Sequence, residues 1–213
     1  MPKSNRFRIL NQELSRLKKQ LIPKPSFTGL YSDRQLTRTV AYRVLAHAEI
    51  ESYLEDRAWE VVQNAKNIWD NTGKINLTLI CLLGFSGLTM DAPPETLSPK
   101  KGNKTVKDEQ IKIQKKIDLA LANFKRIINE NHGLKEKNLL ALLLPIGLDI
   151  KDLDTSWLVT MNTFGENRGE VAHKSASFYS IIQPINPVDE VNMVKQIIQD
   201  LLKIDELMNL LMK

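Results

Sequence analysis

The chain has 213 residues, of which 42% are hydrophobic and 26% are charged, and these proportions are typical of a soluble globular protein with one buried core. Nine glycines and nine prolines are too few for a glycine-rich nucleotide-binding α/β domain or a turn-rich sandwich. A single cysteine, Cys81, excludes an internal disulfide and a zinc site built from several thiolates. The apolar neighbours of Cys81 predict a buried side chain.

The net charge is +5, and the excess positive charge is concentrated in two segments. The amino-terminal segment, opposed only by Glu13, contains Lys3, Arg6, Arg8, Arg16, Lys18, Lys19 and Lys24. The second segment, opposed by Asp108 and Glu109, contains Lys100, Lys101, Lys104, Lys107, Lys112, Lys115 and Lys116. Clustered positive charge is typical of a protein that binds a polyanion, although a solvated basic surface without a partner also fits.

Targeting signals are not evident. The amino terminus is polar and basic and has no signal-peptide pattern, and no uninterrupted apolar run approaches the roughly 20 residues of a membrane span. We therefore expect a cytoplasmic protein that makes no contact with a membrane.

Helical periodicity predicts a first helix over about residues 5–21, which a pair of prolines ends. A second, long helix is predicted over about residues 33–69, with Asp33 as its cap and Asn71-Thr72-Gly73 at its end. The predicted apolar stripe of this second helix consists of Leu36, Val40, Val44, Ala48, Glu51, Leu54, Ala58 and Val61.

A short apolar segment at residues 77–83 predicts one or two helical turns in the core. Residues 84–105, rich in Gly, Pro, Ser and Lys, predict a loop of unusual length for a compact domain, and such loops are often functional. A third long helix is predicted over about residues 106–131, with Asn131-His132-Gly133 at its end. Residues 137–148 are strongly apolar but are broken by a proline and a glycine.

Two further helices complete the prediction. One begins with Asp154 or Thr155 as its cap, and the last spans about residues 187–212 with Asn186 as its cap and Pro187 in its first turn. No strand pattern persists and nothing repeats, so the fold class is all-α.

The domain organisation follows from these elements. An amino-terminal helix or arm is predicted at residues 1–31, and a single helical bundle at residues 32–213 contains the long loop 84–105.

One polar segment interrupts the helix that begins near Asp154, and its sequence is Asn167-Arg168-Gly169-Glu170-Val171-Ala172-His173-Lys174. Arg168 supplies a fixed cation, and His173 can transfer protons near neutral pH. This pair suits metal-independent RNA cleavage, in which a 2′-hydroxyl attacks phosphorus, histidine moves the protons and a guanidinium holds the phosphate oxygens. By residue type alone, the pair also fits an arginine bound to a nearby carboxylate and a histidine that caps a helix.

The spacing of the pair constrains the geometry of a site. A five-residue step turns a helix by about 500°, which leaves Arg168 and His173 about 140° apart. We expect Gly169 to distort this turn, or two copies of the chain to line a shared cleft with one residue from each.

The segment from Phe164 to His173 resembles the HEPN superfamily (higher eukaryotes and prokaryotes nucleotide-binding), whose signature is an arginine, four to six residues and a histidine on a late helix. The sequence of this segment is similar to sequences of the RiboL-PSP-HEPN branch, which is found in prokaryotic defence systems. The segment Ala41–Glu55 is also similar to this branch. The resemblance covers about residues 32–213. Many active members carry Asn, Asp or His directly after the arginine, whereas this chain has Gly169, and Asn167 could substitute for that residue.

The resemblance implies an all-α homodimer with a composite, metal-independent endoribonuclease site, which serves anti-phage defence or a toxin–antitoxin pair. Arg168 and His173 would be catalytic, RNA would be the substrate, and a cognate antitoxin or defence protein would be a partner. The superfamily also contains members that bind without cutting, so a dimerisation module or a nucleotide- or RNA-binding module is the alternative. No metal and no cofactor are expected.

Supporting residues are predicted with less specific signals. Asn167 and Glu51 are candidates for the site, because Glu51 lies on an apolar stripe where it could orient Arg168 or His173, or pair with any buried cation. Lys174 and the loop residues Lys100, Lys101 and Lys104 are candidates for RNA binding. We expect His47 in the core or an interface and His132 at a helix cap, and we expect the three tryptophans, Trp59, Trp69 and Trp157, in the core or a dimer interface.

Overall fold

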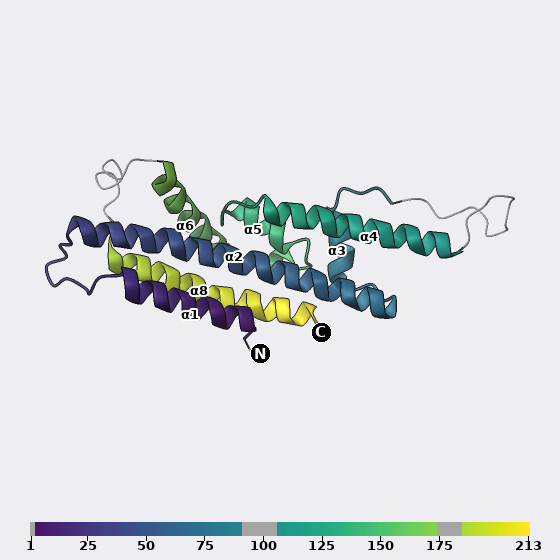
Figure 1. The fold of residues 1–213 in the computed structure, drawn as a ribbon, viewed down its shortest axis with the longest axis horizontal. Helices are drawn as coiled ribbons and strands as arrows, with labels where there is room; N and C mark the ends of the chain where they lie inside the picture. The colour runs from purple at the N-terminus through teal and green to yellow at the C-terminus, as the bar shows by residue number, and fades with distance from the viewer. Residues whose placement is uncertain (1–2, 91–105, 174–184) are drawn as a thin grey trace.

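The structure, a computed structural model, describes residues 3–90, 106–173 and 185–213, without the side chains of residues 106–111 and 170–173. The described residues form helices without a strand, so the predicted all-α fold is confirmed. Figure 1 shows α1, α2 and α8 side by side along the long axis, with α4 and α5 on the other side of α2 and α6 projecting at an angle. The helices are α1 (Asn5–Leu21), α2 (Asp33–Thr72), α3 (Leu77–Phe85), α4 (Val106–Asn129), α5 (Glu136–Leu143), α6 (Thr155–His173) and α8 (Pro187–Leu211).

Helix α1 forms where the sequence predicts it. The Ser4 hydroxyl accepts a hydrogen bond from the Phe7 backbone N–H (3.0 Å) and caps its start. Its buried residues recur at helical spacing and pack against α2 and α8: Phe7, Leu10, Leu14 and Leu17. Helix α1 therefore contributes to the common core, and the division of the chain at residue 31 stays a prediction.

Helix α2 begins with a capping box in which Ser32 and Gln35 bond each other's backbone N–H groups, so Ser32 is the cap and not Asp33. Gly73 ends the helix in the left-handed region (φ 68°), which glycine adopts without strain. The predicted stripe is correct at its carboxyl-terminal half, but Ala48 is exposed. The buried face of the first half instead includes polar residues such as Arg43 and His47, which an apolar pattern does not reveal.

A buried ion pair joins α2 to α8. Arg57 Nε lies 3.1 Å from Asp205 Oδ1, and both side chains are 0% exposed. The Asp205 carboxylate also accepts hydrogen bonds from the Tyr53 hydroxyl (2.8 Å) and from the Ser4 hydroxyl (2.6 Å) and backbone N–H (2.8 Å). Burial raises the pKa of Tyr53, and the neighbouring Asp205 carboxylate raises it further. One carboxylate thus connects three helices.

A second buried pair lies nearer the start of α8. Arg43 Nε donates to Glu190 Oε2 (2.9 Å), and a second guanidinium nitrogen contacts Glu190 Oε1. Asn186 caps α8 by accepting from the Val188 backbone N–H (2.9 Å), as predicted. Burial, together with the Glu190 carboxylate, raises the pKa of the adjacent Tyr42 to about 12.

The remaining helices cover the other side of α2. Helix α3 includes Gly84 and Phe85, so the predicted loop begins too early, and residues 91–105, with Lys100, Lys101 and Lys104, lie outside the described residues. Cys81 is half-buried rather than buried, and burial raises its pKa. In the described part of the chain, none of the helices combines the length and apolarity that crossing a membrane requires.

Replacing Asp205 with alanine should lower the free energy of unfolding by about 3–5 kcal/mol, because it leaves the Arg57 charge buried without its partner. The matched control is Asp56→Ala, which removes the partner of Arg6 at a carboxylate that is 58% exposed and should cost about 0–1 kcal/mol. Urea unfolding followed by circular dichroism measures both changes. Equal losses in the two variants would contradict the structural role assigned to Asp205.

Candidate functional site

Helix α6 carries the predicted site residues. Asp154 caps it as expected, because Asp154 Oδ1 accepts from the backbone N–H groups of Ser156 (2.7 Å) and Trp157 (3.4 Å). The helix continues through Gly169 to His173. Gly169 therefore does not interrupt the helix, although we expected it to distort this turn. The side chain of His173 lies outside the described part of the chain, and so does Lys174.

Arg168 lies in line with the core stripe of α6. Trp157, Met161 and Phe164 are buried in that stripe, and Arg168 follows Trp157 by eleven residues, which is close to three full turns. Arg168 itself is half-buried. A half-buried position is typical of a long cationic side chain, whose aliphatic stem can pack against the core while its charged end stays outside.

Close packing fixes α6 just before Arg168. A Cβ built at the buried Gly165 would lie 3.4 Å from Lys135 N and 3.4 Å from Lys135 Cγ, so a side chain here would press on the segment that leads into α5. Lys135 Nζ also lies 3.8 Å from Glu166 Oε1, whereas Arg168 makes no ion pair with any carboxylate that the structure describes.

His47 of α2 packs against α6. Its ring stacks on that of Phe164, with centroids 5.5 Å apart and an interplanar angle of 30°, and Phe164 lies one turn before Arg168. His47 is 1% exposed, which confirms the prediction of a core residue. Neither ring nitrogen has a hydrogen-bond partner among the described residues, and the nearest carboxylate oxygen, Glu51 Oε2, is 3.4 Å from Nδ1.

Glu51 belongs to a polar cluster between α2 and α5, which we call the α2–α5 cluster: His47, Glu51, Glu55, Asn131 and Asn138. Asn131 Nδ2 donates to Glu55 Oε1 (2.7 Å) and lies 3.5 Å from Glu51 Oε1, and Asn138 Nδ2 donates to Asn131 Oδ1 (2.8 Å). The Glu51 carboxylate therefore faces His47 and Asn131, and the described contacts do not bring it to Arg168. Sequence reasoning missed Glu55, although the four-residue spacing of 47, 51 and 55 places all three on one helix face.

The remaining candidates have structural positions. His132 is exposed beyond the end of α4 and does not cap it. Trp157 is buried, whereas Trp59 and Trp69 are partly buried against the core. Lys125 lies over the Trp59 ring (4.8 Å), and Trp69 Nε1 donates to Gln114 (2.6 Å). Among the described residues, no group of three or more His, Cys, Asp or Glu side chains could hold a metal ion.

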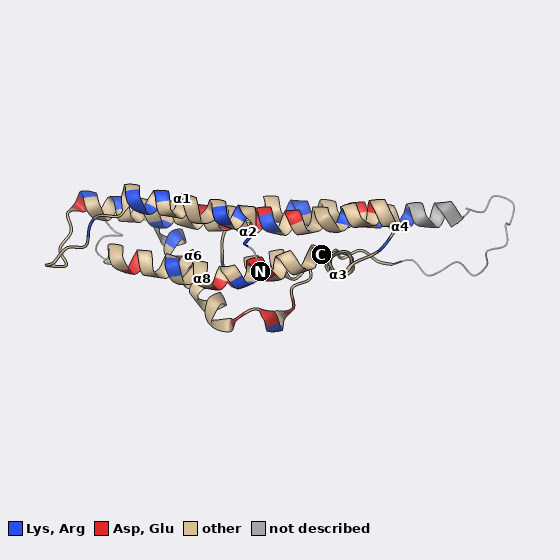
Figure 2. Cartoon of the chain, turned by 90° about the horizontal axis from the view of Figure 1, so that it is seen from below, with Lys and Arg blue, Asp and Glu red and all other residues tan. Residues whose placement is uncertain are grey.

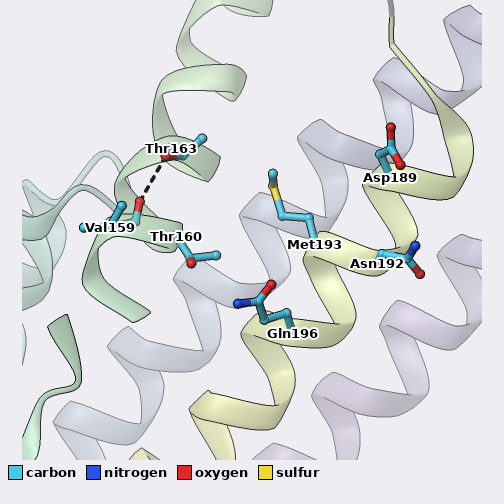
Figure 3. Close-up of a pocket in the computed structure, with 7 residues that line it drawn as sticks. All are labelled: Val159, Thr160, Thr163, Asp189, Asn192, Met193 and Gln196. Carbon is cyan, nitrogen blue, oxygen red and sulfur yellow. Dashed lines mark hydrogen bonds between the residues drawn. The ribbon is translucent and has the colours of Figure 1, made fainter. Parts of the chain in front are cut away.

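A cavity of about 350 Å³ lies between α6 and α8, and its lining residues are drawn in Figure 3: Val159, Thr160, Thr163, Asp189, Asn192, Met193 and Gln196. The figure shows Thr160, Met193 and Gln196 between the two helices, with Asn192 on the side of α8 away from α6. Asn167 follows Thr160 by seven residues, close to two turns, and so falls on the helix face that lines this cavity.

Replacing Glu55 with glutamine should stabilise the protein at pH 7. Burial raises the pKa of Glu55 above its usual 4.5, an effect that the Asn131 hydrogen bond only partly offsets. The folded state binds the proton of the Glu55 carboxyl more tightly than the unfolded state does. The ionised carboxylate therefore destabilises the fold at pH values above the raised pKa. The stability difference between Glu55→Gln and the native protein disappears at pH values below the usual pKa of glutamate. Thermal unfolding at pH 7 and pH 4 measures it, with the exposed Glu130→Gln as control. A Glu55→Gln variant that is less stable at pH 7 would contradict this account.

Comparison with known proteins places these features in a family. The RiboL-PSP-HEPN family model matches residues 5–209, which include α1 and the whole of α6. No curated protein and no solved structure matches the chain. The HEPN superfamily includes endoribonucleases and nucleotide-binding modules, and its members commonly dimerise and bind RNA. Since the match spans nearly the entire sequence, the chain belongs to the RiboL-PSP-HEPN family.

Proposed function

We propose that this protein is a metal-independent endoribonuclease that uses Arg168 and His173. The observation that carries the proposal is the state of Arg168: it is half-buried, follows the core stripe of α6, and makes no ion pair with a described carboxylate. A guanidinium at this edge of the core can bind an external anion. A phosphodiester fits it, because two phosphate oxygens match the planar fork of donors.

The chemistry assigns separate tasks to the two residues. The ribose 2′-oxygen loses its proton to an imidazole and attacks the adjacent phosphorus, which forms the O2′–P bond of a 2′,3′-cyclic phosphate. The P–O5′ bond breaks, and an imidazolium protonates the departing 5′-oxygen. Arg168 stabilises the negative charge that develops on the non-bridging oxygens. The reaction needs no metal and no cofactor.

A homodimer explains how the residues cooperate. Positions 168 and 173 are about 140° apart around an unbroken helix, so one copy does not direct both toward a single phosphate. Two copies whose α6 helices meet would supply Arg168 and His173 to a composite site. Asn167, on the face that lines the α6–α8 cavity, would add an amide donor where many relatives have a polar residue after the arginine.

We assign the activity to anti-phage defence or to a toxin–antitoxin pair that acts on cytoplasmic RNA, with a cognate antitoxin or defence protein as regulator. Toxicity on expression that His173→Ala relieves would support this assignment. Harmless expression of an enzyme that is active on RNA in vitro would argue against it.

A second candidate is a non-catalytic dimerisation or RNA-binding module of the same fold, and Gly169 favours it because a polar residue is missing directly after the arginine. A Cβ built at Gly169 meets no atom of the described residues within 4 Å, so Gly169→Asn should fold normally. If the chain is an enzyme, cleavage by Gly169→Asn should equal or exceed that of the native protein. Absence of cleavage in both would favour the binding module.

Replacing His173 with alanine should lower the rate of RNA cleavage by about 10²–10⁴, and Arg168→Ala should lower it by about 10²–10³, because each removes transition-state stabilisation. The assay follows labelled RNA in EDTA and identifies 2′,3′-cyclic phosphate ends. His132→Ala and Arg126→Ala are matched controls, because both residues are exposed and lie on or just after α4. Undiminished cleavage by the His173 and Arg168 variants would refute the proposed site.

A further inference from the structure

A groove with positively charged walls separates the end of α1 from the start of α8, on the side of α8 away from α6. It consists of a cavity of about 550 Å³ and an adjoining one of about 320 Å³. Both are lined by Ser15 and Lys18 of α1 and by Val191 and Lys195 of α8. Because the two cavities share these residues, they form one continuous groove, which we call the basic groove.

Positive charge dominates the lining of the basic groove. Its lining contains four exposed lysines, Lys18, Lys19, Lys24 and Lys195, and no acidic residue. None of the four forms an ion pair with a carboxylate that the structure describes. A cleft lined by one sign of charge concentrates its field and attracts ions of the opposite sign.

Other cations of the amino-terminal segment behave differently. Arg6 Nε lies 2.7 Å from Asp56 Oδ2, and Arg16 pairs with Glu13 (2.6 Å). Figure 2 shows the Lys and Arg positions in blue along α1. Lys18, Lys19 and Lys24 of this segment line the basic groove, so this part of the positive charge faces the cavity.

The floor of the basic groove is apolar. Ile22, Pro23 and Pro187 line it together with Val191, and the prolines present no backbone N–H. A floor of this kind can contact sugar and base surfaces while lysines on both walls follow phosphates, as in proteins that bind single-stranded nucleic acids. A duplex does not fit between two helices in contact, whose axes lie about 8–10 Å apart.

The basic groove and the α6–α8 cavity share one lining residue on α8. Asn192 lines both the basic groove and the α6–α8 cavity, and Figure 3 shows it on the outer side of α8. A strand that crosses α8 at Asn192 would continue along Thr160 and Thr163 toward Arg168. Asp189, the acidic residue of the α6–α8 cavity, would repel phosphates there and favour contact through sugar and base.

We infer that the basic groove binds the single-stranded flank of an RNA substrate and directs it toward α6. This inference rests on the proposed function, which supplies RNA as the substrate. Lys18 and Lys195, on opposite walls and common to both cavities, would contact separate phosphates.

Fluorescence anisotropy with a labelled single-stranded RNA of 15 nucleotides tests the inference, in full-length His173→Ala protein so that the RNA stays intact. Lys18→Gln/Lys195→Gln should raise Kd about tenfold at 0.15 M salt, and it should reduce the slope of log K against log salt by about 1.4, the loss of two phosphate contacts on a single strand. The matched control is Lys74→Gln/Lys137→Gln, which has the same net charge and alters two exposed lysines that lie outside the groove and pair with no described carboxylate. Its Kd should stay within about twofold of the parent.

Equal weakening by the two double variants would overturn the inference, and so would an oligo-glutamate peptide that displaces the RNA and binds the groove more tightly. The failure of this inference can be distinguished from the failure of the proposed function. Cleavage by the native protein with groove-independent binding would refute only the basic groove. Groove-dependent binding without any cleavage would refute only the enzymatic assignment.

Discussion

The Asp205 carboxylate is the contact on which the arrangement of the bundle depends. It lies fully buried beside Arg57 and accepts hydrogen bonds from Tyr53 and from both the hydroxyl and the backbone N–H of Ser4. A buried ion pair adds little net stability by itself, because desolvation offsets the attraction, but leaving one partner alone is costly. The network therefore favours the register of α1, α2 and α8 in which Asp205 meets all of these partners, and α1 and α8 enclose the basic groove in that register.

Helix α6 is held by a different kind of contact. Gly165 allows the helix to approach Lys135 closely, and Phe164 stacks on the buried ring of His47. Both contacts lie within one turn of Arg168, so the backbone that carries the arginine is anchored although its guanidinium is partly exposed. His47 in turn belongs to the α2–α5 cluster, in which Asn131 bonds Glu55 and Asn138 bonds Asn131. A candidate site held by rigid elements can keep a cation in position without a protein partner for its charge.

The distribution of charge connects the two parts of the molecule. The sequence shows a basic amino-terminal segment. In the structure, Arg6 and Arg16 of this segment pair with carboxylates, whereas Lys18, Lys19 and Lys24 line the basic groove. Paired cations contribute little potential outside the protein, whereas unpaired lysines on the walls of a groove attract anions. The groove opens beside the N-terminal half of α8, and that helix also forms one wall of the α6–α8 cavity. Helix α8 thus lines both the groove that attracts anions and the cavity beside α6.

The sequence alone predicted the long helices, the amino-terminal caps of α6 and α8 and the candidate pair Arg168 and His173, because apolar spacing, capping residues and prolines act locally along the chain. It did not reveal that Arg43 and Arg57 are buried, since an arginine enters a core only when a distant partner meets it, here Glu190 and Asp205. It likewise associated Glu51 with the site, whereas Asn131, eighty residues away, and His47 engage it. Which cations stay unpaired, and which helices enclose a groove between them, depend on contacts between segments far apart in sequence, and only the tertiary structure decides those.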